Sequence, residues 1–197
     1  MSILGVILAG GLARRMGGQD KAFLRLGGVP LLDRAMARLD PQVDGMAINS
    51  NADSALFDGY APALVPDLDA ARAGPLAGVL AGLTHAEGAG AAHIVTVAVD
   101  TPFFPLDLVT RLRAAADAQG VPLACAATGA RTHPVFGLWP VSLRADLAEA
   151  LAAGERKVDR WTGRHGCAVV EYGAEPFDPF FNVNTPEDLV VAEGLAS

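Results

Sequence analysis

The first segment of the chain with residues that could do chemistry is a loop of glycines and cations directly after the apolar run 3–8. It holds two glycine pairs and three cations, namely Gly10, Gly11, Gly17, Gly18, Arg14, Arg15 and Lys21. Their spacing matches neither the GxxxxGKS/T pattern of a P-loop nor the GxGxxG pattern of a dinucleotide-binding loop. Glycines nevertheless let backbone N–H groups approach an anion closely, and the cations attract phosphate. The loop therefore predicts a phosphate cradle, with a surface turn of solvated cations as the alternative.

A carboxylate and two amides follow later apolar segments and are candidates for holding a cation. Asp100 ends the uncharged run 93–99, and Mg²⁺ prefers oxygen ligands that often include a carboxylate and a phosphate. Asn182 and Asn184 alternate on an extended segment just before the last helix, so both side chains are expected on one face. Turn and cap roles stay open for all three residues, because Asp-Thr-Pro favours a turn and the amides precede a helix.

Further polar side chains stand where the second and third apolar runs end: Asn49, Asn51, Asp53 and Asp67. They are interpreted either as ligand contacts or as parts of Asx-turns. Gly74 and Gly78 flank the start of a helix of small residues, which would accommodate a ligand ring or close packing on a sheet. His133 precedes a proline and is a candidate base on the substrate side, with a structural role as the alternative.

Short apolar runs alternate with helical patterns along the chain. The runs that predict strands are 3–8, 45–49, 63–65, 93–99, 121–127, 134–139 and 167–172. Helices are predicted within 30–39, 75–86, 105–120, 141–161 (a helix and then a shorter one) and 185–196. This alternation is typical of βαβ units on a mostly parallel sheet, whose ligands bind beyond the carboxyl ends of the strands. We therefore expect the loops after Leu8, Asn49, Val65 and Val99 to lie along one edge.

Composition sets the broad class of the protein. The chain has 197 residues, of which 51% are hydrophobic and 19% charged, enough for one domain with a sizeable core. A net charge of −7 disfavours a general binder of nucleic acid or anionic membranes. Cys125 and Cys167 stand far apart and are expected to be buried small hydrophobes. The uncharged stretch 73–86 is too short to span a membrane, and no signal-peptide pattern begins the sequence, so we expect a soluble, cytoplasmic protein.

Taken together, these segments resemble the nucleotidyltransferases that join an NTP to a phosphorylated acceptor, most closely the molybdenum cofactor guanylyltransferases. The stretch LAGGLARRMGGQDKAFL (8–24) follows the glycine-rich loop of that family almost throughout, with Ala13 where a small Ser or Ala is usual. Further motifs follow in the family's order: GPLAG (74–78), VDTPFFP (99–105), HPVFGLW (133–139), GERKV (154–158) and NVNTPEDL (182–189). The resemblance therefore covers essentially the whole chain.

The resemblance implies a three-layer α/β/α architecture with a mostly parallel sheet, the Rossmann-like nucleotidyltransferase fold of nucleotide-diphospho-sugar transferases. It implies one domain over 1–197, with a nucleotide-binding half over about 1–120 and an acceptor-binding half over about 121–197. The implied reaction is the Mg²⁺-dependent transfer of GMP from GTP to molybdopterin or Mo-molybdopterin, which releases pyrophosphate and forms the guanine dinucleotide cofactor. Transient contacts with molybdenum-insertion proteins and molybdoenzyme chaperones are implied as well, but no nucleic acid or membrane partner.

The resemblance also assigns roles position by position. The implied nucleotide-binding residues are Leu8, Ala9, Gly10, Gly11, Lys21, Asn49, Asp67, Gly74, Gly78 and Asp100. The implied catalytic residues are Arg15, Lys21 and Asp100, and the implied metal ligands are Asp100 and Asn184. The acceptor side is assigned to His133, Lys157, Asn182 and Asn184. Lys157 stands where the family commonly has Arg, which keeps the charge but loses bidentate phosphate recognition.

Other functions stay open at this point. A cytidylyltransferase of the same fold acting on molybdopterin is the nearest alternative, but such relatives tend to read LAAG and lack GPLAG, so Gly11 and residues 74–78 favour guanine. A guanylyltransferase with another phosphorylated acceptor is more distant. A non-catalytic nucleotide-binding protein of this fold is the alternative from a different class, and the intact Lys21, Asp100 and Asn184 argue against it.

Overall fold

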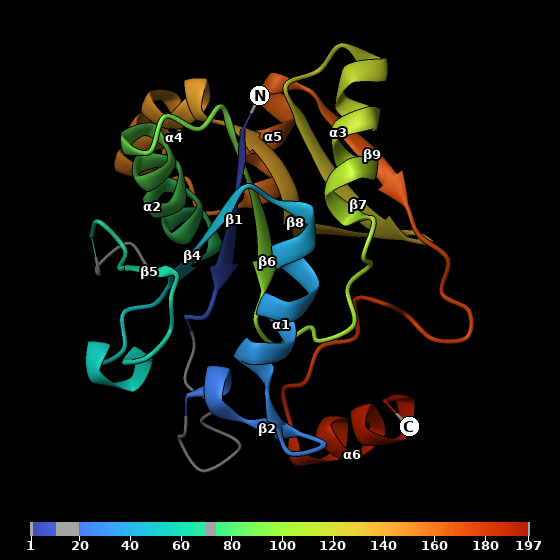
Figure 1. Ribbon diagram of the computed structural model, residues 1–197. Helices are drawn as coiled ribbons and strands as arrows, with labels where there is room; N and C mark the ends of the chain where they lie inside the picture. The colour runs from blue at the N-terminus through green and yellow to red at the C-terminus, as the bar shows by residue number, and fades with distance from the viewer. Residues whose placement is uncertain (1, 11–19, 70–73, 197) are drawn as a thin grey trace.

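The computed structural model describes residues 2–10, 20–69 and 74–196, and a seven-stranded sheet runs through its centre (Figure 1). In spatial order its strands are β5 (Ala63–Val65), β4 (Gly45–Asn49), β1 (Ile3–Leu8), β6 (His93–Ala98), β8 (Arg131–Pro140), β7 (Leu123–Thr128) and β9 (Cys167–Glu171). A separate short ribbon pairs β2 (Arg25–Leu26) with β3 (Val29–Pro30). Each run that the sequence predicts as a strand lies in the central sheet.

The direction of the strands divides the sheet. The pairs β1–β4, β1–β6, β4–β5 and β7–β9 are parallel, whereas β8 runs antiparallel to β6 and β7. The prediction of a mostly parallel sheet is therefore confirmed. β8 is longer than the predicted run 134–139 because it begins at Arg131, directly after a tight turn. Gly129 takes a left-handed φ of 55° in that turn, and Thr128 pairs with Arg131, so the two strands must be antiparallel.

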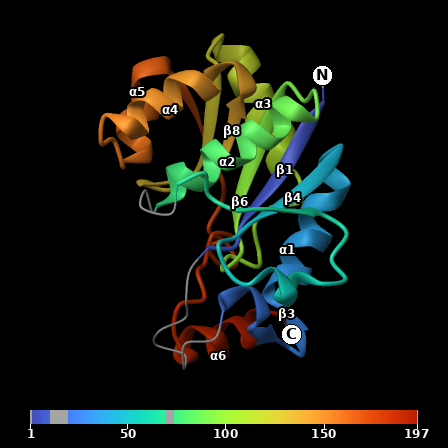
Figure 2. The ribbon, with the colours of Figure 1, turned by 90° about the vertical axis from the view of Figure 1, so that its left-hand side faces the viewer.

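Helices cover both faces of the sheet and give three layers (Figure 2). They are α1 (Leu31–Leu39), α2 (Pro75–Gly88), α3 (Leu108–Gln119), α4 (Arg144–Ala152), α5 (Val158–His165) and α6 (Pro186–Leu195). Buried side chains of α1 and α3 pack with one face of the sheet, and those of α2, α4 and α5 pack with the other. α6 lies apart from these layers, close to the ribbon of β2 and β3 (Figure 1). The three-layer α/β/α architecture that the resemblance implied is confirmed.

The helix ends show where local signals act. The helix predicted over 105–120 begins only at Leu108, because the N–H of Leu108 still closes a turn to the carbonyl of Pro105. It ends at Gly120, whose left-handed φ of 62° provides the expected glycine cap. Thr185 is the N-cap of α6, as the sequence predicts. Among the described helices, none is both long and apolar enough to cross a membrane.

The layer of α2 is packed closely against the sheet. α2 is apolar on nearly all sides because it lies between the sheet and α4. Gly82 permits the approach, since a Cβ there would lie 2.8 Å from a methyl group of Val6. Trp139 of β8 stacks on Trp161 of α5 with ring centroids 6.0 Å apart, so α5 packs on the same face of the sheet as α2. Cys125 is buried in β7, as expected for a small hydrophobe, whereas Cys167 in β9 is partly exposed.

The parallel register brings the carboxyl ends of β1, β4, β5 and β6 to one edge of the sheet. Leu8 pairs with Asn49, and Asn49 pairs with Val65, so these strands end side by side. The chain returns to the same edge near its C-terminus, where the N–H of Val183 donates to the carbonyl of Asp100 at 2.8 Å. The loops that carry the candidate residues therefore meet where the sequence predicts.

A buried hydrogen bond between β6 and β8 provides a test of this fold. The indole N–H of Trp139 donates to the hydroxyl of Thr96 at 2.8 Å, and both side chains are buried. Thr96→Val keeps the shape but leaves this N–H without its partner, so we expect the free energy of unfolding to fall by about 1–3 kcal/mol in urea denaturation. The control Thr110→Val, exposed on α3, should change stability by less than about 0.5 kcal/mol. Equal losses in the two variants would contradict this role of Thr96.

Candidate functional site

A cavity of about 510 Å³ opens at the carboxyl edge of the parallel strands, a size typical of small-molecule sites. Among its lining residues are many that the sequence singled out: Leu8, Gly10, Lys21, Asn49, Asp67, Gly74, Asp100 and Asn182. Asn51 also lines it, and Val135 of β8 contributes an apolar wall. The structure thus brings together residues from both halves of the chain around one space.

The cation of the site is the ammonium group of Lys21. Its Nζ donates to Oδ2 of Asp100 at 2.9 Å and to Oδ1 of Asn184 at 2.5 Å. The side chains of Lys21 and Asp100 are 17% and 19% exposed, so solvent screens this ion pair only partly. Asn184 therefore joins the site through Lys21, although it is not among the residues that line the cavity. Two oxygens from distant parts of the chain converge on one positive charge.

Asp20 holds Lys21 in place. Lys21 begins a short 3-10 turn, and the carboxylate of Asp20 caps this turn by accepting the N–H of Ala22 at 2.9 Å. Burial raises the pKa of Asp20 from its ordinary value, and the hydrogen bond from Ala22 opposes that shift. Asp20 is not among the residues predicted from the sequence, although its position directly before Lys21 could have indicated that it supports this lysine.

The segment before α6 is held by a capping box. Asp188 accepts the backbone N–H groups of Asn184 and Thr185, both at 2.9 Å, and its own N–H donates to the Thr185 hydroxyl at 3.1 Å. These hydrogen bonds, foremost the one from Asn184, lower the pKa of Asp188. Asn182 accepts the hydroxyl of Thr101 at 2.5 Å through its Oδ1. Asn182 thus contacts Thr101, just after β6, whereas Asn184 contacts Lys21. Thr101 is a residue that the sequence reasoning overlooked.

A second polar network lies at the ends of β4 and β5. Asp67 accepts the amide of Asn49 through Oδ1 at 2.9 Å and the amide of Asn51 through Oδ2 at 2.8 Å. The Asn49 amide also donates to the carbonyl of Val65 at 3.0 Å. Asp53 instead accepts the N–H of Ala55 and caps a short turn, which is the Asx-type role that the sequence left open. Asn49 and Asp67 therefore act together, with Asn51 as a third member.

Two small residues bring the backbone close to this network. Ala9 is buried, and its N–H donates to the carbonyl of Asn49 at 2.9 Å, which extends the pairing of β1 with β4. Gly78 in α2 lies against the Asn49 side chain, and a Cβ there would clash with Oδ1 of Asn49 and lie 2.9 Å from Cδ2 of Leu8. Gly78 thus packs against the network rather than lining the cavity.

His133 occupies a packed position beside the cavity wall. Its ring stacks on Phe180 with centroids 4.5 Å apart, and its Nε2 lies 3.1 Å from the hydroxyl of Thr128. Burial lowers the pKa of His133 below its ordinary value. Val135, and not His133, is the residue of this strand that lines the cavity. These contacts favour the structural alternative for His133 over that of a base.

Lys157 stands outside the cavity lining. It is the exposed N-cap residue of α5, and its backbone N–H donates to the carboxylate of Glu155 at 3.1 Å. The preceding helix α4 ends nearby, where Leu151 and Leu68 line one small cleft. The other residues of the predicted phosphate cradle lie outside the described residues, namely Gly11, Arg14, Arg15, Gly17 and Gly18.

Residues 5–168 match the family model of the MobA-like NTP transferase domain. The chain is 49% identical to a molybdenum cofactor guanylyltransferase of Bradyrhizobium sp. (strain ORS 278), over 100% of this chain and 94% of that protein. It is 51% identical to one from Rhodopseudomonas palustris (strain HaA2), over 97% of this chain and 91% of that protein.

A solved structure shows the same arrangement of elements. The fold is similar to the crystal structure of molybdopterin-guanine dinucleotide biosynthesis protein A from Archaeoglobus fulgidus, with a TM-score of 0.77. That alignment covers 98% of each chain at 26% sequence identity. Sequence and fold therefore point to the same group of proteins.

The close approach of Gly78 yields a test of the site. Gly78→Ala places a Cβ against Oδ1 of Asn49, so the Asn49 amide must move away from Asp67. We expect the affinity for a nucleoside triphosphate, measured by isothermal titration calorimetry, to fall about tenfold, the equivalent of one lost hydrogen bond. Gly88→Ala in the same helix is the control, because a Cβ there meets nothing within 4 Å. Unchanged affinity for the nucleoside triphosphate in Gly78→Ala would show that the network does not bind the nucleotide.

Proposed function

Because this chain belongs to the MobA-like NTP transferase family, as a relative of molybdenum cofactor guanylyltransferases, we propose that it transfers GMP from GTP to molybdopterin or Mo-molybdopterin. The products are pyrophosphate and the molybdopterin guanine dinucleotide cofactor. The observation that carries this proposal is one cavity that contains both the Lys21–Asp100 ion pair and the carboxylate of Asp67. GTP binds there with its phosphates at Lys21 and its base at Asp67.

Asp67 supplies the group that selects guanine. Each of its carboxylate oxygens accepts one amide N–H, from Asn49 and from Asn51, and each has a second lone pair for another donor. Guanine presents two adjacent donors on one edge, the N1–H and the 2-amino group, which a carboxylate accepts as a pair. Cytosine and adenine place an acceptor nitrogen in this position, which a carboxylate repels. The same carboxylate therefore disfavours the alternative of a cytidylyltransferase.

Lys21 and the glycine loop bind the triphosphate. Lys21 now directs two of its three donors at Asp100 and Asn184, and these donors would turn to phosphate oxygens when Mg²⁺ binds the two side chains. Gly10 lines the cavity and has open space where a Cβ would stand, which lets a phosphate approach its backbone. Arg15, outside the described residues, is the further cation that the sequence resemblance assigns. On a chain of net charge −7, these groups supply the local positive field that a triphosphate needs.

Asp100 and Asn184 are the residues that would hold Mg²⁺. Their Oδ2 and Oδ1 atoms lie within hydrogen-bond distance of one Nζ, so both oxygens are aimed at the same cation position. Carboxylate and amide oxygens are the hard donors that Mg²⁺ prefers, usually together with phosphate oxygens of the substrate. Over the described ranges, no cluster of three or more His, Cys, Asp or Glu could hold a metal ion. When bound, Mg²⁺ would stabilise negative charge on the triphosphate.

The reaction is a displacement at the α-phosphorus of GTP. An oxygen of the molybdopterin phosphate forms a bond to this phosphorus, while the bond from the phosphorus to the bridging oxygen breaks and pyrophosphate leaves with the electron pair. Lys21 stabilises the charge that develops on the phosphate oxygens, and the glycine loop holds the triphosphate in line. The attacking phosphate is already anionic and needs no general base, which agrees with the packed position of His133.

The acceptor binds on the side of residues 121–197, and the nucleotide on the side of residues 1–120. Asn182 lines the cavity and holds its Oδ1 on Thr101, so its NH₂ group can donate to an anionic acceptor. Lys157, outside the cavity lining, is the cation that the sequence resemblance assigns to the acceptor. We place the enzyme in the cytoplasm, with GTP and molybdopterin as substrates and transient contacts to molybdenum-insertion proteins and molybdoenzyme chaperones.

Competition among nucleotides tests the proposed function most directly. We expect GTP to support Mg²⁺-dependent transfer to molybdopterin at least about a hundredfold better than CTP or ATP, since only guanine offers both donors to Asp67. Pyrophosphate release and formation of the dinucleotide measure the two products separately. A preference for CTP would point to the cytidylyltransferase, and nucleotide binding without pyrophosphate release would point to a non-catalytic protein.

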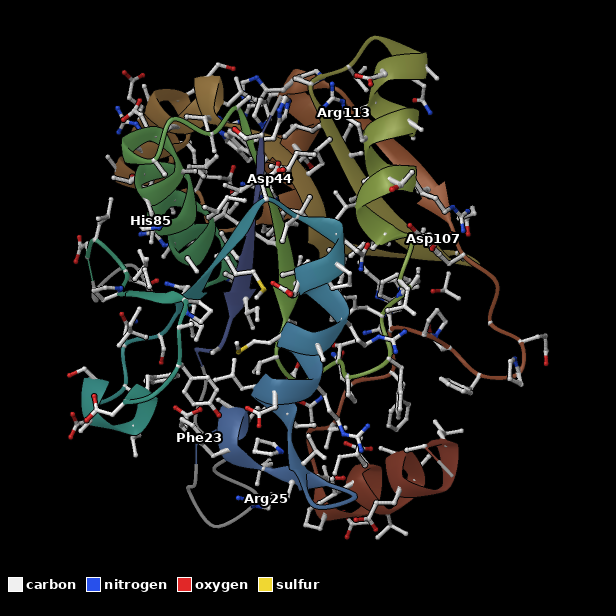
Figure 3. The ribbon with its side chains drawn as sticks, viewed as in Figure 1. Phe23, Arg25, Asp44, His85, Asp107 and Arg113 are labelled. Carbon is white, nitrogen blue, oxygen red and sulfur yellow. The ribbon has the colours of Figure 1, made fainter. Side chains whose placement is uncertain are left out.

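Substitutions of the ion pair test its part in the reaction. Asp100→Asn and Lys21→Met should each lower kcat/KM for transfer by about a hundredfold or more, because each removes a charge from the phosphate site. Thermal unfolding should show that both variants still fold. The control is Asp117→Asn. Asp117 forms a salt bridge with Arg113, which lies at the opposite end of the molecule from Phe23, two residues after Lys21 (Figure 3). Near-normal turnover in either site variant would contradict the role of that residue.

A further inference from the structure

Asn51 and Asp67 are joined by two hydrogen bonds that run in opposite directions. The amide of Asn51 donates to Oδ2 of Asp67 at 2.8 Å, and the backbone N–H of Asp67 donates to Oδ1 of Asn51 at 2.8 Å. Asn51 thereby contacts both the side chain and the backbone of the residue, and it fixes how the carboxylate is turned relative to the chain. Neither the sequence resemblance nor the proposed roles assign Asn51 a function.

The Asp67 carboxylate is held at both oxygens, but by two differently placed side chains. Asn49 is buried and holds Oδ1, whereas Asn51 is exposed and holds Oδ2. Without Asn51, the carboxylate would be fixed at one oxygen only and could rotate about its Cβ–Cγ bond. A pair of parallel hydrogen bonds to a ligand requires both oxygens in a fixed plane.

The hydrogen bonds of Asn51 are exposed to solvent, so they contribute little to folding. Its side chain is exposed, so its removal buries no unpaired group. The loop around it has its own supports, since the hydroxyl of Ser50 accepts the N–H of Ala52 and Asp53 caps the next turn. The position of Asn51 in the cavity lining is thus explained by what it does to Asp67.

We propose that Asn51 is a positioning residue for base selection, which fixes the Asp67 carboxylate so that it accepts the N1–H and the 2-amino group of guanine together. This inference rests on the proposed function, because it concerns how the same cavity selects its nucleotide. Asn51 uses its amide on Asp67 and acts on the base through that carboxylate. Its contribution is therefore to discrimination between bases more than to the binding of phosphate.

Inosine triphosphate is the probe that separates these effects, because it differs from GTP only by the missing 2-amino group. We expect the wild-type protein to bind GTP about tenfold or more tightly than ITP in calorimetry, as one charge-assisted hydrogen bond is lost. In Asn51→Ala and Asn51→Leu, the dissociation constant of ITP divided by that of GTP should fall by about threefold or more. The reason is that the loosened carboxylate no longer offers both oxygens in one plane. Affinity for ITP should change less than affinity for GTP.

Asp53→Ala is the matched control in the same loop, since it removes a turn cap without touching Asp67. It should leave the dissociation constant of ITP divided by that of GTP as in the wild type. An unchanged ratio in both Asn51 variants, or an equal fall in Asp53→Ala, would overturn the role of Asn51. A wild-type protein that binds GTP, ITP and CTP alike would instead overturn the proposed guanine site itself, so the two failures are distinguishable.

Discussion

One ammonium group connects the parts of the chain that make this site. Lys21 bonds to Asp100 and Asn184, which stand 79 and 163 positions from it in the sequence. A different local structure positions each of the three side chains. Lys21 begins a capped 3-10 turn, Asp100 follows the end of the central strand β6, and Asn184 precedes a helix with a capping box. Because the ion pair is partly buried, its two charges interact more strongly than on the open surface. The arrangement depends on all three supports at once.

The sheet explains why these supports meet. The parallel strands β1, β4, β5 and β6 end at one edge, and the antiparallel β8 lies directly beside β6. The second half of the chain is therefore packed against the strand that carries Asp100, and it supplies Val135 and Asn182 to the cavity. The backbone N–H of Val183 also donates a hydrogen bond to the carbonyl of Asp100, so the C-terminal segment lies at the same strand end. Residues from both halves of the chain thus surround one strand end.

Much of this could be predicted from the sequence, because periodicity and the rule about strand ends are local signals. The strands, the cap at Gly120 and the shared edge of Leu8, Asn49 and Val65 follow from them. The direction of β8 was not foreseen, since it depends on a two-residue turn at Gly129 rather than on its apolar pattern. The packed state of His133 was left open for a different reason, because its partner Phe180 is distant in sequence. Long-range pairings of this kind leave no mark on composition or spacing.

The two hydrogen-bond networks of the cavity share no residue. One consists of Asn49, Asn51 and Asp67 at the ends of β4 and β5, and the other of Lys21, Asp100 and Asn184. Changes in groups without common partners tend to add independently. Under the proposed function, selection of the base and stabilisation of phosphate charge can therefore vary separately on this fold. A relative that retained the phosphate network but replaced Asp67 and its amide partners would keep the same chemistry while accepting another base.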